Sequence, residues 1–311
     1  MSDLEQYILE EWAEDYREGL LNRREFLRRT VLMAGGAALA SPILQHLGVA
    51  ASDAEVAEAA SGSPPTVAQG TGVTVSPTDP ALESQMVTFA LGTGAVLAYR
   101  VQPKGASPAP GVIVIHENRG LVEHIKDVAR RLAKVGYVSL AVDLASPAGG
   151  TAKFSDPAEV TTLLGKTPPE QLVAMLTAGV RYLQGLPTVR RDRIGAIGFC
   201  FGGGMTWRLA TQSPEVRAAV PFYGPNPPIA DVAKIKAAVL AIYGALDERV
   251  NAGIPAMREG LQKIGVPHEI VIYPGADHAF FNDTGPRYVD EAAKDAWKRA
   301  LAWFDRYLRQ V

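Results

Sequence analysis

The stretch that decides the fold is GAIGFCFGGG at residues 195–204, which places a cysteine in a glycine-rich turn. Apolar residues 194–199 predict a buried strand, and the sequence MTWRLA at 205–210 predicts a helix. Between them, GFCFG at 198–202 fits the pattern Gly-x-nucleophile-x-Gly, with Cys200 where serine usually stands. Glycines on both sides let the strand and helix backbones pass closely. The turn therefore predicts a raised Cys200 at a helix N-terminus, where amides and dipole favour a thiolate.

Length and composition limit the possibilities. A chain of 311 residues is long enough for one large α/β domain or two small domains. Its net charge of -2 gives no electrostatic argument for nucleic-acid binding. Cys200 is the single cysteine, which excludes an intramolecular disulfide and a cysteine-cluster metal site. Cys200 is thus a free thiol, and by itself the turn would also fit an inert core cysteine.

The first 52 residues predict an export segment. Residues 1–22 are polar and acidic, and NRREFLRR at 22–29 resembles a bacterial twin-arginine signal. A mildly apolar stretch follows at 30–52, although these residues would also fit an amphipathic or transmembrane helix. We expect the twin-arginine export machinery to bind residues 22–48 and to deliver a folded protein to the periplasm or the exterior. An uncleaved segment would act as a membrane anchor, and the cleavage site stays open.

A linker and a folded domain follow the export segment. Residues 53–82 are rich in Ala, Ser, Gly, Pro and Thr, which predicts a flexible linker before a domain at 83–311. Alternating runs at 85–91 and 95–102 predict a hairpin. Beyond it, apolar strands alternate with helices; we expect strands at 112–115, 137–142, 194–199, 218–222, 239–243 and 269–273, and helices at 125–135, 172–183 and 289–308. This alternation predicts an α/β fold with a mostly parallel central sheet and helices on both faces.

Three chemically reactive residues follow three of these strands. Cys200 comes first, Asp247 follows the strand at 239–243, and His278 follows the last strand. Parallel strands end at one edge of the sheet, where ligands bind in such folds. The chain order nucleophile, acid, histidine is that of α/β-hydrolases. We expect His278 to take the thiol proton and Asp247 to orient the imidazole, with Asp277 or Glu248 as alternative acids.

An oxyanion hole needs two backbone amides that point at the developing negative charge. The amide of Phe201, directly after the nucleophile, is the first candidate. The loop HENRGL at 116–121 follows the first long strand, and we expect Asn118 to supply the second amide.

The chain resembles the dienelactone hydrolases (carboxymethylenebutenolidases) over about residues 84–310. The resemblance rests on HENRG at 116–120, GFCFGG at 198–203, the loop of Asp247, and DHAFF at 277–281. It implies the α/β-hydrolase fold and a matching role for Glu117. In the family, this glutamate contacts the resting thiol and helps to generate the thiolate when substrate binds. A surface carboxylate at a strand end would be the alternative for Glu117.

The substrate-binding residues of the family carry over less completely. The family's arginines clamp a substrate carboxylate, but residues 144–175, where one is expected, contain no arginine. Arg119 is a candidate for this role, and Tyr223, Phe280 and Phe281 are candidates for an apolar pocket wall.

The sequence as a whole predicts a cysteine hydrolase of carboxylic esters or lactones that works through an acyl thioester. It implies no metal ion and no organic cofactor. A thioesterase or acyltransferase with the same triad would fit the same residues, and so would a non-catalytic binding protein of the cell envelope. The exact substrate and the oligomeric state stay open.

Overall fold

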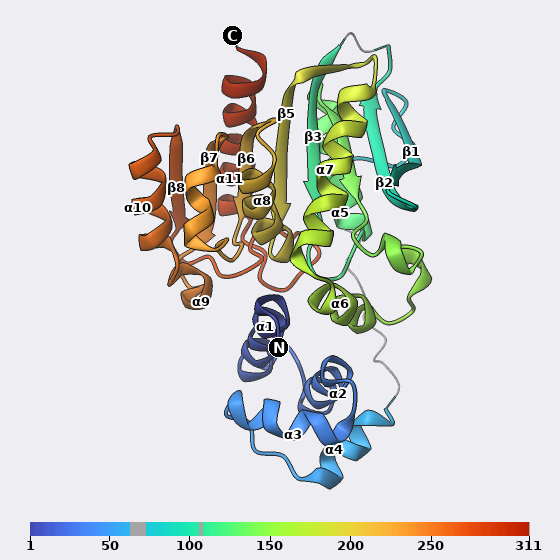
Figure 1. Cartoon of the computed structure of the whole chain (residues 1–311), viewed down its shortest axis with the longest axis vertical. Coiled ribbons are helices and arrows are strands. Elements are labelled where there is room, and N and C mark those ends of the chain that lie inside the picture. Colours follow the sequence, from blue (N-terminus) through green and yellow to red (C-terminus); the bar gives the residue numbers. More distant parts are fainter. Residues whose placement is uncertain (63–72, 106–107, 311) are drawn as a thin grey trace.

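The computed structural model describes residues 1–62, 73–105 and 108–310. Within these residues, eight strands form one sheet in the order β1-β2-β4-β3-β5-β6-β7-β8 (Figure 1). The strands are β1 (Leu82–Leu91), β2 (Gly94–Pro103), β3 (Ala109–Ile115), β4 (Val138–Val142), β5 (Val189–Phe199), β6 (Val216–Phe222), β7 (Ala238–Gly244) and β8 (His268–Tyr273).

Strand directions confirm the sheet and the hairpin predicted from the sequence. β1 and β2 pair antiparallel around the turn at residues 92–93, and β2 pairs antiparallel with β4. All other neighbouring strands are parallel. The central strands are continuous apolar runs because both faces of a parallel sheet are covered, and every residue of β4 and β7 is buried.

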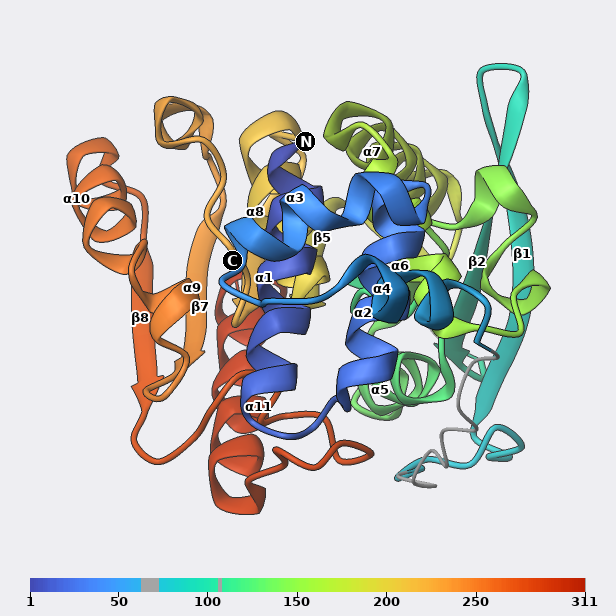
Figure 2. The same cartoon turned by 90° about the horizontal axis from the view of Figure 1, so that it is seen from below.

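Helices cover both faces of the sheet. Figure 2 shows α7 and α8 on one side of it and α5 and α11 on the other. The helices of this part of the chain are α5 (Glu123–Lys134), α6 (Pro157–Lys166), α7 (Pro169–Gly185), α8 (Phe201–Gln212), α9 (Glu248–Asn251), α10 (Ile254–Ile264) and α11 (Asp290–Phe304). Short 3-10 or π turns lie at Ser146–Ala148, Thr151–Lys153, Ile229–Lys234 and Asp305–Arg309.

Four further helices form before the sheet begins. They are α1 (Asp3–Arg17), α2 (Arg23–Ala34), α3 (Ala37–His46) and α4 (Asp53–Ala60). Local sequence explains where they start, because the side chains of Ser2, Asn22 and Ser52 each accept a hydrogen bond from a backbone amide in the first helical turn. Gly35 ends α2 with a φ of 81°, a left-handed conformation that glycine adopts without strain.

These four helices revise part of the predicted domain boundaries. The stretch at 53–82 does not begin as a flexible linker, since a capping box of Ser52 and Glu55 starts α4 inside it. Of the remainder, residues 63–72 lie outside the described residues. Within the described part of the chain, no helix has the length and apolar character needed to cross a bilayer. The export function of residues 22–48 stays a prediction.

The N-terminal helices lie together at the carboxyl edge of the sheet (Figures 1 and 2). A buried ion network fixes α2 there: Arg28 Nε lies 2.7 Å from Glu25 Oε2, and its Nη1 lies 2.6 Å from Asp156 Oδ2. All three side chains are at most 8 % exposed. Because Asp156 also caps α6, this network joins the N-terminal helices to a loop region of the sheet domain. The helices therefore cover the edge at which α/β folds bind ligands.

Candidate active site

Cys200 occupies a strained turn between β5 and α8. Its φ of 56° lies in the left-handed region, which non-glycine residues seldom adopt. The flanking glycines are required by close packing: a Cβ on Gly198 would lie 2.2 Å from the carbonyl oxygen of Gly202. A Cβ on Gly202 would lie 2.4 Å from the carbonyl oxygens of both Ile115 and His116. The predicted turn is thus present, and it brings the end of β3 against the start of α8.

His278 and Asp247 form a hydrogen-bonded pair beside this turn. The distance between His278 Nδ1 and Asp247 Oδ2 is 2.6 Å, and both side chains are at most 4 % exposed. Burial alone would raise the pKa of Asp247, but the charge of His278 lowers it below its ordinary value. For His278, burial favours a low pKa, but the charge of Asp247 and the hydrogen bond to it raise the pKa above its ordinary value. Asp277, the alternative acid, instead accepts a hydrogen bond from the backbone amide of His278.

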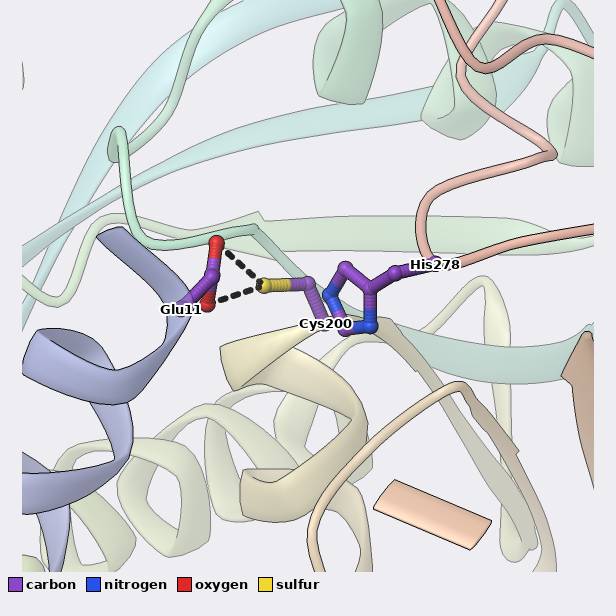
Figure 3. Close-up of side chains that lie close together, drawn as sticks. All are labelled: Glu11, Cys200 and His278. Carbon is purple, nitrogen blue, oxygen red and sulfur yellow. Dashed lines mark hydrogen bonds between the residues drawn. The ribbon is translucent and has the colours of Figure 1, made fainter. Parts of the chain in front are cut away.

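The hydrogen bonds of the Cys200 thiol go to α1, a partner that the sequence did not predict. Sγ lies 3.5 Å from Glu11 Oε2 and 3.7 Å from Glu11 Oε1 (Figure 3). Tyr7 Oη, also on α1, is 3.5 Å from the sulfur. Burial and the charge of Glu11 raise the pKa of the thiol. The sulfur is therefore held as a protonated thiol that donates to Glu11. His278 Nε2 has no hydrogen-bond partner among the described residues.

Two residues of the loop after β3 have side-chain hydrogen bonds, and that of Glu117 differs from the expected one. Glu117 was expected to contact the resting thiol, but its Oε2 accepts a hydrogen bond from Asn282 Nδ2 at 2.7 Å. The Glu11 carboxylate lies beside the sulfur instead. Asn118 donates from Nδ2 to Glu11 Oε1 at 2.8 Å. Phe201 is the first residue of α8, so its amide has no acceptor within the helix and is free to bind an anion.

A cavity of about 460 Å³ opens beside the thiol. Cys200, His278 and Glu117 line it together with Arg119, and α1 contributes Glu11 and Asp15. Arg119 is exposed and, among the described residues, forms no hydrogen bond or ion pair, so its guanidinium is available to an anionic ligand.

The three aromatic residues predicted as pocket wall lie in the core instead. Tyr223, Phe280 and Phe281 are at most 2 % exposed, and within the described chain they are not among the residues that line this cavity. The rings of Tyr223 and Phe281 pack with Phe199 and Phe222 at the ends of β5 and β6, and the Phe280 ring packs against Tyr223. Tyr223 also supports the catalytic histidine candidate, with ring centroids 5.1 Å apart. The cavity wall instead mixes charged residues such as Glu11 and Arg119 with apolar residues such as Leu21 and Val122.

Among the described residues, Glu11, Cys200 and His278 form the group whose ligand atoms are close enough to suggest a metal ion, all within 4.8 Å of one another. The sulfur and the carboxylate in this group already hydrogen-bond each other. The arrangement is thus explained by a resting thiol.

Comparison with known proteins agrees with this geometry. The model of the dienelactone hydrolase family matches residues 96–308, which include the turn, the histidine and the aspartate. The chain belongs to the dienelactone hydrolase family. It is therefore a hydrolase with the α/β-hydrolase fold, as the sequence predicted. The N-terminal helices α1–α4 lie outside the matched residues.

Individual relatives support the same assignment. A protein of Methylorubrum extorquens, provisionally named a carboxymethylenebutenolidase, is 36% identical over 233 residues, which cover 71% of this chain and 80% of the relative. A similarly named protein of Synechocystis is 33% identical, and the match covers 73% of this chain and 98% of that protein. A provisionally named dienelactone hydrolase from Klebsiella pneumoniae is 34% identical in sequence. Its crystal structure superimposes with a TM-score of 0.67, and the match covers 73% of this chain and 100% of that chain.

Proposed function

We propose that the protein hydrolyses carboxylic esters or lactones with Cys200 as the nucleophile. The observation that carries the proposal is the buried His278–Asp247 pair, 2.6 Å between Nδ1 and Oδ2, next to a cysteine on a strained strand-to-helix turn. The names of the relatives point to a lactone, because carboxymethylenebutenolidases are named for a butenolide ring.

In the proposed reaction, the thiol proton moves to His278 Nε2 as Sγ attacks the carbonyl carbon. Asp247 fixes the imidazole tautomer and stabilises the imidazolium. A carbon–sulfur bond forms, the carbon–oxygen bond breaks, and His278 returns the proton to the leaving alkoxide. Water then hydrolyses the thioester to a carboxylate and regenerates the thiol. In a lactone, the alcohol produced in the first half stays attached to the acyl group.

Backbone amides would stabilise the negative charge of the tetrahedral intermediate. We assign this role to the amide of Phe201, at the start of α8, and to that of Asn118 in the loop after β3. Arg119 supports an anionic substrate, since its free guanidinium lines the cavity. We also assign to Glu117 a role in thiolate formation, which requires it to leave its hydrogen bond with Asn282.

Export by the twin-arginine route is a separate part of the proposal. It is supported by the motif at 22–29, in which Arg24 is exposed and Arg23 is partly exposed. Cell fractionation of the wild type against Arg23→Lys/Arg24→Lys tests it: the variant should accumulate in the cytoplasm. Equal export of the two proteins would contradict the twin-arginine route, and a wild type retained in the cytoplasm would contradict export.

The test of the chemistry compares wild type with Cys200→Ala on a dienelactone, p-nitrophenyl acetate and an acyl thioester. We expect wild type to turn over an oxygen ester or the lactone, and the variant to lose at least about a thousandfold in kcat/KM. A clear preference for the thioester would favour the thioesterase alternative. Turnover unchanged in Cys200→Ala would refute the cysteine mechanism, and loss of all turnover in a wild type whose Cys200 resists alkylation would favour a binding protein.

A further inference from the structure

The acidic face of α1 lies on the active site. Glu11, Glu14, Asp15 and Glu18 are spaced three, four and seven residues apart, which places them on one side of a helix. Each of these carboxylates meets a polar group of the sheet domain. Glu11 meets the thiol and Asn118, and the other three meet two arginines, as the next paragraph describes.

The two arginines come from the loops that carry the catalytic candidates. Arg249, two residues after Asp247, lies 3.2 Å from Glu14, and its Cζ lies 4.7 Å from the ring centroid of Tyr7. Arg287 lies 2.9 Å from Asp15 and 2.5 Å from Glu18. These two guanidinium groups thus bind the carboxylates of α1, as they would bind those of an anionic ligand.

Glu11 occupies the position that a substrate carbonyl needs. A reacting carbon must come within about 3–3.5 Å of the nucleophile. Both carboxylate oxygens of Glu11 already lie 3.5 and 3.7 Å from Sγ, and Cys200 is only 3 % exposed. Figure 3 shows the Glu11 carboxylate facing the sulfur, with the His278 ring on the other side of Cys200. A substrate carbonyl and Glu11 cannot occupy this position together.

The chemistry of Glu11 also fits the site. Ester hydrolysis ends in a carboxylate, so the site must hold a carboxylate beside Sγ at the end of each turnover. Glu11 presents the same group from within the chain, with Asn118 Nδ2 as its second donor. The residues matched by the family model, 96–308, include the nucleophile, the acid and the histidine, so α1 is an addition to a complete catalytic unit.

We propose that α1 is a tethered competitive inhibitor, in which Glu11 fills the acyl position and the acidic face holds Arg249 and Arg287. Substrate reaches Cys200 only when α1 moves away. Carboxylate-bearing substrates compete best, because they offer the site the groups that α1 offers. This inference rests on the proposed function, since it concerns the regulation of the same site.

The test uses the full chain and three variants. Glu11→Ala removes the carboxylate at the sulfur. A triple variant, Glu14→Gln/Asp15→Asn/Glu18→Gln, weakens α1 docking without touching the thiol's partners. Glu10→Ala is the matched control, because Glu10 is on the same helix and bonds only to Gln6 within the described residues. Thermal unfolding of each variant reports whether the sheet domain stays folded.

Alkylation by iodoacetamide measures access without any substrate. The label can go only to Cys200, the single cysteine of the chain. We expect Glu11→Ala and the triple variant to react about tenfold faster than wild type or more, since each loses charge-assisted interactions, and Glu10→Ala to match wild type. Rates equal to wild type in both the Glu11 and the triple variant would overturn the proposal.

Hydrolysis of p-nitrophenyl acetate separates inhibition from assistance. A tethered competitor raises KM and leaves kcat unchanged, so the triple variant should show a lower KM at wild-type kcat. A kcat that falls in Glu11→Ala with KM unchanged would overturn the proposal and make Glu11 a positioning residue. Faster alkylation in both variants with no hydrolysis of any ester would refute the proposed function and leave the inhibitory docking of α1 standing.

Discussion

Arg28→Ala should release the N-terminal helices from the sheet domain. In the wild type, Arg28 is only 7% exposed in its side chain and connects Glu25 on α2 with Asp156 at the start of α6. Removing one partner of a buried ion pair costs about 3–5 kcal/mol, because the remaining charge is left buried. Here Glu25 keeps Arg29 at 2.6 Å and Asp156 keeps the amide of Ala158 at 2.9 Å. We therefore expect the lower end, about 3 kcal/mol.

Hydrogen exchange followed by mass spectrometry measures this loss where it occurs. A change of about 3 kcal/mol corresponds to roughly a hundredfold change in an opening equilibrium. Amides of α2 should exchange faster by about that factor in Arg28→Ala, while those of β5 and β7 should keep their protection. Arg24→Ala, an exposed position on the same helix, is the control and should change stability by less than about 0.5 kcal/mol. If α2 exchanges equally fast in both variants, the buried network does not hold the helices.

Two further predictions concern acid stability and the turn. Burial opposes ionisation of Glu25, but hydrogen bonds and charge from Arg28 and Arg29 hold its pKa below the ordinary 4.5. The stabilisation from ionised Glu25 is thus present above pH 4.5 and is lost as the pH falls through the lowered pKa. Urea unfolding at pH 7 and in acid should therefore show a larger decrease in the free energy of unfolding for wild type than for Arg28→Ala. A Cβ at Gly202 would meet two backbone carbonyls at 2.4 Å, so Gly202→Ala should lower ester turnover by about a hundredfold; Gly185→Ala, where nothing lies within 4 Å, should not, and equal turnover in the two would contradict the packing argument.

The sheet could be predicted from the sequence because its signal is local. The central parallel strands are buried on both faces and therefore appear as short apolar runs, as at residues 112–115 and 239–243. The positions of Cys200, Asp247 and His278 at one edge then follow from strand direction alone.

The docking of α1 could not be predicted, because it depends on contacts between residues far apart in the sequence. Glu11 meets a thiol 189 residues further along the chain, and Glu18 meets Arg287 across 269 residues. The available signal was the acidic spacing on an amphipathic helix, which is also typical of a solvated face. The twin-arginine resemblance predicts an export segment and says nothing about folded helices. Capping residues Asn22 and Ser52 were the local sign that these residues form helices.

The side-chain hydrogen-bond partners at the site also could not be predicted from the sequence. Glu117 lies in the loop where the motif predicts, but its carboxylate accepts a hydrogen bond from Asn282, which is 165 residues away in the sequence. Aromatic residues next to a catalytic histidine can either line a cavity or support it from the core. Phe280 lies in the core, where its ring packs against Tyr223 and Tyr273, and Tyr223 contacts the His278 ring.

The separation of Glu11 from Cys200 along the chain has a consequence for biosynthesis. At about 5–20 residues per second, a ribosome needs roughly 10–40 s to add the 189 residues between them. During that time α1 can pack against α2 but not against the turn of Cys200, and a helix of 15 residues is only marginally stable alone in water. The carboxylates of α1 help to keep this segment soluble until the rest of the site has been synthesised. By the time the cysteine leaves the ribosome, the group that will shelter it has already been made.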